Sequence, residues 1–363
     1  MRYDGLSTEG RTQLSTGLVA LYQDPETGSA INTHSMLKTF RRCPKQCDYK
    51  YHQRLKPKTT GKPLRQGTWM HKLQEIYYRG GDWEEAHEVM SRKFMELFDE
   101  ERDVLGDLPS ECARMMKSYL WHYKADHWKI HEAEFVLETT FPNGSIYRAK
   151  IDLLVEDQYG LWIVDHKWNK NLPDLTFRIL DAQSALYCWA AVRNGLNVQG
   201  HIWNYGKRKP PTIPKLVKAG NRLYGTQIET DYPTLRAAIK AYGLDPAPYA
   251  EELARLKSHR YVPGDVQRSP FFRRSVLEKT PEMLKQVARE GYHTARRMNE
   301  YDFSRPEWVE RVPDRSCTWM CSYVDVCSME LFGGHTENLR KQKYKIADPL
   351  EYYNDDPKNP EEE

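Results

Sequence analysis

The sequence predicts an α/β fold, in which a small mixed sheet is flanked by helices and joined to a helical annex. The first observation is a change of period in the middle of the chain. Three stretches there alternate or run apolar as strands do, namely 135–141, 146–157 and 161–167. The second observation is the helical period on either side, over 64–79, 83–101, 111–129, 176–194 and 280–299. Because helices precede and follow one small sheet, we expect a single α/β or α+β domain.

Composition excludes several classes of protein. The chain has 363 residues, of which 39% are hydrophobic and 29% charged, with a net charge of +3. Disordered and collagen-like chains do not have this composition. No run approaches 18 consecutive apolar residues, and the first residues lack the apolar core of a secretory signal. We therefore expect a cytoplasmic protein without membrane contact, whose seven cysteines do not form a disulfide framework.

The ends of the chain differ from its middle. Residues 1–33 are predicted to form an irregular arm, followed by a helix with Ser35 as its N-cap. One folded domain is expected over 34–335, and an acidic tail over 336–363 that is disordered from Glu351 onwards. The domain is expected to have a mainly helical part (34–130), a core (131–300) and a cysteine-rich part (301–335). Two helix ends carry clear signals: Gly195 closes 176–194, and Thr280 with Pro281 begins the last long helix.

Positive charge gathers in two segments. Residues 41–65 contain nine Lys and Arg against Asp48, a net charge of +8, and a basic, proline-rich loop spans 207–218. With Tyr49, Tyr51 and Trp168 to stack bases, these segments could form a phosphate-binding track. A solvated charged face is the alternative.

Two aspartates mark the predicted hairpin. A turn centred between Gln158 and Tyr159 pairs 157 with 160 and 156 with 161, and the same register places Asp152 opposite Asp165 at about 4.5–5.5 Å. Alternation puts Tyr147, Ala149, Ile151, Leu153 and Val155 on one face of the first strand, and Asp152 on the other. Two opposed carboxylates repel each other, and a divalent cation between them removes the conflict. Lys167 shares a face with Asp165 and could position a water or stabilise a phosphorane-like transition state. The alternative is that Asp152 is solvated and Asp165 merely ends a strand.

Two predicted helices add polar side chains. His71 and Glu75 lie on one face of 64–79, and Gln183 and Tyr187 lie on one face of the apolar helix 176–194. A buried Gln amide without a partner costs about 1–3 kcal/mol, so Gln183 needs either a core partner or a nucleic-acid phosphate.

Four short motifs in order resemble the RecB-like branch of the PD-(D/E)XK nucleases. They are Gly67-x3-His71, Ala149-Lys150-Ile151-Asp152, Asp165-His166-Lys167 and Gln183-x3-Tyr187, and the resemblance covers about residues 35–330. Ala149 stands where the family usually has Gly. The resemblance implies that His71, Asp152, Asp165 and the backbone carbonyl of His166 bind Mg2+ or Mn2+. It further implies that Lys167 is the catalytic lysine, and that Gln183 and Tyr187 contact the nucleic-acid backbone near the scissile phosphate.

Four cysteines have the spacing of a metal site. Cys317, Cys321 and Cys327 fall within eleven residues, and Cys43 lies near the N-terminus, with Cys47 as its substitute. Four thiolates can hold zinc or a [4Fe–4S] cluster. The arrangement resembles the iron–sulfur RecB-like nucleases, which implies a [4Fe–4S] cluster that joins the two ends of the domain, although the first spacing is three residues here instead of two. Zinc and ordinary reduced thiols are the alternatives.

These observations together predict a metal-dependent DNA nuclease, and most of all an exonuclease acting on DNA ends or single strands. No G-x-x-x-x-G-K-[ST] motif occurs, so an ATP motor would have to come from a helicase or recombination partner. Three alternatives stay open: an endonuclease or nickase with the same site, a non-catalytic nucleic-acid-binding subunit of recombination or repair, and a zinc-stabilised binding module. The oligomeric state is not predicted.

Overall fold

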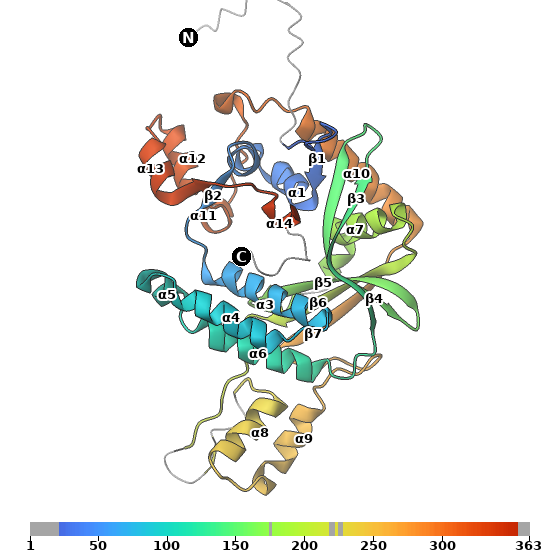
Figure 1. Cartoon of the computed structure of the whole chain (residues 1–363), viewed down its shortest axis with the longest axis vertical. Helices are drawn as coiled ribbons and strands as arrows, with labels where there is room; N and C mark the ends of the chain where they lie inside the picture. Colours follow the sequence, from blue (N-terminus) through green and yellow to red (C-terminus); the bar gives the residue numbers. More distant parts are fainter. Residues whose placement is uncertain (1–21, 174–175, 218–221, 224–227, 355–363) are drawn as a thin grey trace, which may run out of the picture.

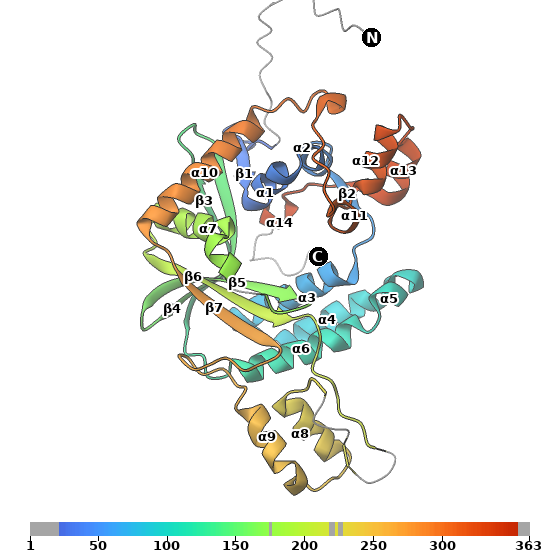
Figure 2. The same ribbon diagram turned by 180° about the vertical axis from the view of Figure 1, so that it is seen from behind.

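The computed structural model describes residues 22–173, 176–217, 222–223 and 228–354. A six-stranded mixed sheet lies at its centre and helices cover both faces, which confirms the predicted α/β fold (Figures 1 and 2). The strands are β1 (Ile31–Thr33), β3 (Lys129–Thr140), β4 (Ile146–Asp157), β5 (Gly160–Asn169), β6 (Val198–Lys207) and β7 (Phe272–Glu278).

The sheet leaves a gap on one edge of β4. The strand order is β1-β4-β5-β6-β7, and β3 pairs with β4 from Thr140/Ile146 to Lys129/Glu156. Because β3 occupies one edge of β4, the short parallel strand β1 and the antiparallel strand β5 share the other edge. β1 pairs with 146–148 and β5 with 153–157, so residues 149–152 lack a strand partner on that edge. β5–β6 is parallel and β6–β7 antiparallel.

Helices form one layer on each face of the sheet (Figures 1 and 2). The layer on one face consists of α1 (His34–Arg42), α7 (Ala182–Arg193) and α10 (Pro281–Asn299). The layer on the other consists of α3 (Lys62–Tyr78), α4 (Trp83–Met95), α5 (Asp99–Leu105) and α6 (Leu108–His122).

The predicted helix 83–101 is wrong, because the chain forms α4 and α5 instead. Phe98 is extended at the break, and the three acidic residues that follow it stabilise the N-terminal turn of a new helix. The predicted helix 176–194 is likewise divided. Its first part is the 3-10 segment η2 (Thr176–Leu180), and Asp181 then caps α7 by accepting from the backbone N–H of Gln183 at 2.9 Å.

The N-terminal arm was predicted wrongly at its end. Residues 31–33 belong to the sheet as β1, and Thr33, not Ser35, caps α1 by accepting from the backbone N–H of Met36. The caps predicted for α10 and for the end of α7 are confirmed: Thr280 caps α10, and Gly195 has a φ of +81° after α7. Residues 1–21 lie outside the described residues.

The acidic tail was also predicted wrongly. Residues 344–346 form β8, which pairs antiparallel with β2 (Leu55–Pro57), and Glu351–Asn354 form the short helix α14. The C-terminal part packs beside α2 and β2, so distant segments of the chain lie side by side (Figure 1). The remaining elements there are α2 (Pro44–Cys47), the π-helix η1 (Asp48–His52), η4 (Pro306–Trp308), α11 (Cys317–Met320), α12 (Val324–Leu331) and α13 (Glu337–Lys343). Residues 355–363 lie outside the described residues.

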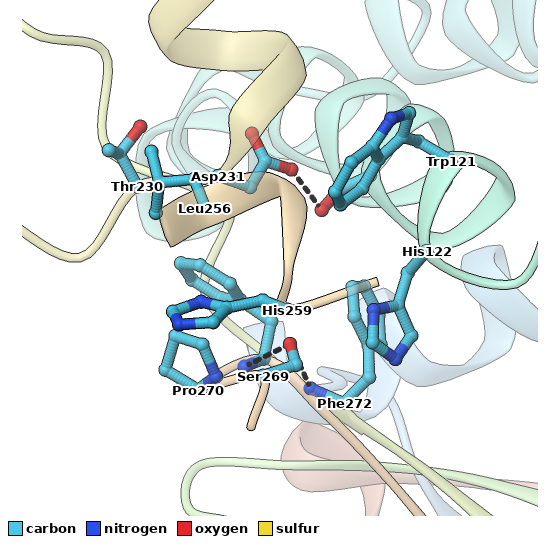
Figure 3. A pocket seen from close by; sticks show the side chains of 11 residues that line it. Trp121, His122, Thr230, Asp231, Leu256, His259, Ser269, Pro270 and Phe272 are labelled. Atoms are coloured by element: carbon cyan, nitrogen blue, oxygen red, sulfur yellow. Dashed lines mark hydrogen bonds between the residues drawn. The ribbon is translucent and has the colours of Figure 1, made fainter. Parts of the chain in front are cut away.

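The helical part predicted before the sheet forms α3–α6. A separate helical annex, which the sequence did not predict, is inserted between β6 and β7. It contains α8 (Tyr232–Ala241), η3 (Ala247–Tyr249) and α9 (Ala250–Lys257). A cavity of about 10 Å³ lies where the annex meets α6, beside Asp231 and His259 (Figure 3). Its volume fits about one water molecule, and Ser118 closes it by donating to Asp231 at 2.5 Å. No described helix is both long and apolar enough to cross a membrane.

The hydrophobic face of β4 changes partners along the strand. Tyr147, Ala149 and Ile151 pack in the core beneath α7 and α10, whereas Leu153 and Val155 belong to a second core with Trp162 and Tyr78. The predicted single face is therefore wrong. The change occurs at Asp152, opposite Glu134, whose left-handed backbone interrupts β3.

Candidate active site and metal centre

The two aspartates lie where the β4–β5 hairpin opens. The observed register pairs Asp157 with Gly160 and Glu156 with Leu161, as the turn predicts, and it ends at Leu153 opposite Val164. Asp152 and Asp165 occupy the next position. There the backbone N–H of His166 donates to Asp152 Oδ2 at 2.7 Å. Asp152 and Asp165 are 9% and 2% exposed, so the alternative that Asp152 is solvated is wrong.

A third carboxylate, which sequence reasoning missed, meets Asp152. Glu134 of β3 lies between the pairs Ala133/Leu153 and Phe135/Ile151, and therefore opposite Asp152. His71 of α3 completes the group: its Nδ1 lies 3.4 Å from Asp152 Oδ2 and 4.0 Å from Glu134 Oε1. One donor atom from each of the three residues lies within 4.8 Å of the other two, and among the described residues no other His, Cys, Asp or Glu set gathers this closely.

The backbone at Glu134 is strained. Its φ is +49°, in the left-handed region that few residues other than glycine adopt. Backbone strain of this kind costs about 1–3 kcal/mol and is concentrated at functional sites. The strain turns this carboxyl side chain inward beside Asp152. Strand alternation could not have indicated Glu134, because the left-handed residue breaks the period.

Asp165 is held by two neighbours. Its Oδ2 forms an ion pair with Lys167 Nζ, and its Oδ1 accepts from Gln183 Nε2 at 2.8 Å. The side-chain amide of Gln183 thus has a hydrogen-bond partner within the protein, which is the first of the two alternatives considered above. Tyr187, one turn later on α7, is 7% exposed and lines the same cavity.

Burial sets the protonation of these groups. It raises the pKa of Glu134 to about 8, with the charge of Asp152 adding to the effect, and it raises that of Asp165 to about 6. The pKa of Asp152 is also raised by burial. Burial lowers the pKa of His71 to about 4, so its imidazole is neutral at pH 7, the form that binds metals.

Lys167 keeps its charge although it is half-buried. Burial alone would lower the pKa of its ammonium group, but the carboxylates of Asp165 and Asp152 outweigh burial and raise it. Lys167 is therefore a fixed positive charge beside the carboxylates. The side chain of His166 lies on the opposite face of β5 from Asp165 and Lys167. It stacks on Tyr78 and contacts Asn204 at 3.3 Å, so its backbone is the part that contacts Asp152.

The site opens into a cavity of about 300 Å³. The C-terminal segment forms part of its wall: Tyr352 donates to Glu134 Oε2 at 3.2 Å, and its backbone oxygen accepts from Lys150 Nζ at 2.9 Å. Lys150 also lies 3.7 Å from the centre of the Tyr352 ring. The lining residues come from seven segments, and they are Thr33, Ser35, Lys50, Tyr51, His71, Lys150, Asp152, Asp165, Lys167, Gln183, Tyr187, Pro349, Leu350, Tyr352 and Tyr353.

The cysteine segments lie together although 274 positions separate them. Arg42 Nη2 donates to Ser316 Oγ at 2.8 Å, next to Cys43 and Cys317. Burial raises the pKa of the Cys321 thiol, and Cys317 and Cys43 are close enough to raise it further. Cys47 instead lies in the hydrophobic core, where burial raises the pKa of its thiol. Cys112 and Cys188 are fully buried, as expected.

The predicted base-stacking track is wrong. Tyr49, Tyr51 and Trp168 are buried in the hydrophobic cores. Several of the basic side chains are neutralised within the chain, as the pairs Lys45–Glu330, Lys62–Glu111, Arg65–Glu101 and Lys207–Glu229 show. Lys218 lies outside the described residues.

Comparison with known families decides the class of protein. The model of the PD-(D/E)XK nuclease superfamily matches residues 32–328. The chain belongs to the PD-(D/E)XK nuclease superfamily. Nucleases of this superfamily act on nucleic acids and use divalent metals, and in this chain His71, Glu134 and Asp152 lie close enough together to hold such an ion.

Other comparisons add little detail. No curated protein matches the sequence significantly. Among solved structures, the chain is similar to a "Putative exonuclease" from Eubacterium rectale, with 15% identity and a TM-score of 0.35, over 73% of this chain and 96% of that one.

Proposed function

We propose that this PD-(D/E)XK chain is a divalent-metal-dependent deoxyribonuclease that acts as an exonuclease on DNA ends or single strands. The observation that supports this most is the convergence of His71, Glu134 and Asp152 beside the Asp165–Lys167 ion pair, at a cavity that all of these residues except Glu134 line. Folding alone gives no reason to bury three carboxylates together.

The donor set fits Mg2+ or Mn2+. Carboxylate oxygens are the preferred ligands of both ions, and a neutral imidazole suits Mn2+. Burial raises the pKa values of Glu134 and Asp165, and a bound cation would compensate these carboxylates for their lost hydration. We assign His71, Glu134, Asp152 and Asp165 as ligands, together with the backbone carbonyl of His166. A bound divalent ion would supply Lewis-acid activation of the phosphate and a lower pKa for a water molecule.

Lys167, Gln183 and Tyr187 have separate roles in the proposed hydrolysis. Hydrolysis adds the oxygen of one water to phosphorus and breaks one P–O ester bond, so negative charge grows on the phosphate oxygens. Lys167, kept positive by its carboxylate neighbours, faces that charge. Gln183 holds the Asp165 carboxylate in place through its hydrogen bond. Tyr187 lines the cavity where the resemblance places a contact to the nucleic-acid backbone.

The wall of the cavity favours the end of a strand over its middle. Pro349, Leu350 and Tyr353 of the C-terminal segment bound the space beside the aspartates. Leu350 is fully buried, so this wall is packed into the core of the domain. A strand end enters a walled cavity more easily than a continuous duplex does. This supports an exonuclease over an endonuclease or nickase.

We also propose that Cys43, Cys317, Cys321 and Cys327 hold a [4Fe–4S] cluster. A Zn–S bond of about 2.3 Å would bring tetrahedral thiolates to about 3.8 Å from each other. Within the described residues, no three of these thiols lie within 4.8 Å of one another, although their segments adjoin. A four-iron cluster separates its thiolates more widely, and the resemblance to iron–sulfur RecB-like nucleases favours it over zinc. Absorbance near 400 nm and bound iron in anaerobically purified protein would test the cluster.

Incubation of end-labelled linear DNA and circular DNA with the purified protein tests the nuclease. With Mn2+ we expect loss of label from linear DNA, intact circles, and no reaction in EDTA. Asp165→Asn should be inactive and still folded. Cutting of circles would favour the endonuclease, and binding without cleavage in any divalent ion would favour the non-catalytic subunit.

A further inference from the structure

Three lysines line the cavity of the candidate site, and two of them are neutralised. Lys167 pairs with Asp165, and Lys150 lies 3.6 Å from Glu134 Oε2 and against the Tyr352 ring. Lys50 is different. Among the described residues it has no carboxylate partner, and its Nζ lies instead over the Tyr51 ring, 4.9 Å from the ring centre.

An unpaired cation in this position is costly. Lys50 lies in the π-helix η1, an element often found at functional sites, and is half-buried. Burial lowers the pKa of its ammonium group, and no described carboxylate compensates for the lost hydration. An anion from outside the chain would do so.

The first turn of α1 lines the same cavity. Thr33, the N-cap of α1, and Ser35 both face it. A helix N-terminus carries backbone N–H groups without intrahelical partners and a partial positive charge, which together attract phosphate groups. The first turn of α1 contains no acidic residue that could satisfy this charge. Lys50 and the N-terminus of α1 thus both present positive charge to the same cavity, where a single anion could contact both.

We propose that Lys50 and the first turn of α1 form a subsite for a phosphate that neighbours the scissile one on the bound DNA strand. The proposal rests on the proposed nuclease function, since the carboxylates of Asp152 and Asp165 in the same cavity mark where the scissile phosphate lies. The subsite fixes the strand by one non-scissile phosphate, so that the next phosphodiester lies beside Lys167. Lys50 is a binding and positioning residue and takes no part in bond breaking.

A salt titration of DNA binding isolates this contact. Fluorescent single-stranded DNA is titrated in EDTA, where cleavage cannot occur, at several salt concentrations with the parent, Lys50→Ala, Lys50→Gln and Lys50→Arg. Lys257→Ala is the matched control, because Lys257 is exposed on α9 of the annex. Each phosphate contact contributes about 0.7 to the slope of log K against log salt for a single strand. Both Lys50→Ala and Lys50→Gln should lose about one such contact, which is about fivefold in affinity at 0.1 M salt.

The outcomes separate this proposal from the nuclease assignment. Lys50→Arg should retain the slope, and Lys257→Ala should match the parent. Parent-like affinity and slope in both Lys50→Ala and Lys50→Gln would overturn the subsite, and so would a parent that binds no DNA. Tighter binding by these variants would also overturn it, since Lys50 would then oppose DNA binding. Cleavage with Mn2+ is measured separately, and its absence would refute the nuclease without altering the salt slopes.

Discussion

At the residue scale, the site is built from charges that oppose each other. Glu134 and Asp152 face each other across β3 and β4, and the strained backbone of Glu134 keeps them together. Lys167 has the opposite role, since it is the positive group nearest to Asp165. Removing either kind of charge should therefore have distinct effects on catalysis and on stability.

Lys167→Ala should lower the rate of DNA cleavage by about 10²–10³, because a preorganised charge that faces the transition state is removed. Binding of DNA should change far less than the rate. Single-turnover cleavage with Mn2+ measures the first effect and anisotropy the second. Lys257→Ala is the control, and a Lys167→Ala enzyme with parental rates would show that Lys167 is structural.

Glu134→Gln should change how the stability of the metal-free protein depends on pH. Glu134 has a folded pKa of about 8 against an ordinary 4.5, so the folded state holds the proton more tightly than the unfolded state does. Between pH 4.5 and 8 the free energy of unfolding therefore falls as the pH rises. Asp152, Glu75, Lys150 and Tyr352 surround the group and are unchanged by the substitution. In EDTA the Gln variant should be less sensitive to pH, and more stable than the parent at pH 8.

Melting curves in EDTA from pH 5 to 8 measure this difference. Part of the slope should persist in the variant between about pH 4 and 6, because Asp165 has a raised pKa as well. Equal slopes in both proteins would mean that the pKa of Glu134 is not raised in the folded state.

The sequence predicted Asp152, Asp165 and Lys167 because strand alternation and a two-residue turn fix their positions locally. It could not predict Glu134, whose inward direction comes from a left-handed backbone and not from any pattern. It also could not predict that Gln183 donates to Asp165, since that contact joins α7 to β5.

At the element scale, the packing of β6 depends on glycines with no room for a side chain. A Cβ at Gly200 would lie 2.2 Å from the backbone oxygen of Leu277 on β7, which is closer than real atoms come. A Cβ at Gly67, in the interior of α3, would instead meet no atom within 4 Å. The two positions therefore respond oppositely to the same change.

Gly200→Ala should destabilise the fold by roughly 2 kcal/mol or more, because β6 and β7 must separate. Gly67→Ala should stabilise it by about 0.5–1 kcal/mol, since alanine favours a helix. Urea denaturation of both variants measures these differences. Destabilisation by Gly67→Ala would show that another constraint acts on α3.

Sequence periodicity predicted elements better than it predicted their ends. β4 has the expected bounds because its alternation and its turn are both local. The single helices predicted over 83–101 and 176–194 are divided because acidic residues begin a new helix in each. The two-stranded β2–β8 sheet could not be predicted, since it pairs segments that are nearly 300 residues apart.

At the scale of the whole molecule, the two ends of the domain are joined beside the site. Arg42 reaches Ser316, and β8 pairs with β2. Closing a loop of about 270 residues costs the unfolded chain about 5 kcal/mol in entropy, so a cluster that spans this loop would stabilise the fold substantially.

Cys43→Ser should therefore remove bound iron and lower the melting temperature, whereas Cys47→Ala should retain the iron. The difference follows from their positions, because Cys43 adjoins Cys321 and Cys47 is enclosed in the core. Iron content and thermal melts of both variants decide the matter. Loss of iron in Cys47→Ala alone would reverse the ligand assignment, and protein with neither iron nor zinc would refute the site.

Binding of a divalent ion should stabilise the whole fold, because the ion offsets repulsion that folding creates. The gain follows RT ln(1 + [L]/Kd), about 2.7 kcal/mol at one hundred times Kd. Asp152→Asn removes one of the buried charges and one ligand together. In EDTA this variant should be at least as stable as the parent, and it should gain less from Mn2+ and cut DNA poorly.

A structural aspartate predicts the reverse, because loss of its bond to the His166 backbone N–H would destabilise the variant in EDTA and leave the Mn2+ response unchanged. Melting curves of both proteins with EDTA and with Mn2+ therefore distinguish a ligand from a structural residue, since only a ligand couples loss of charge to loss of the metal response.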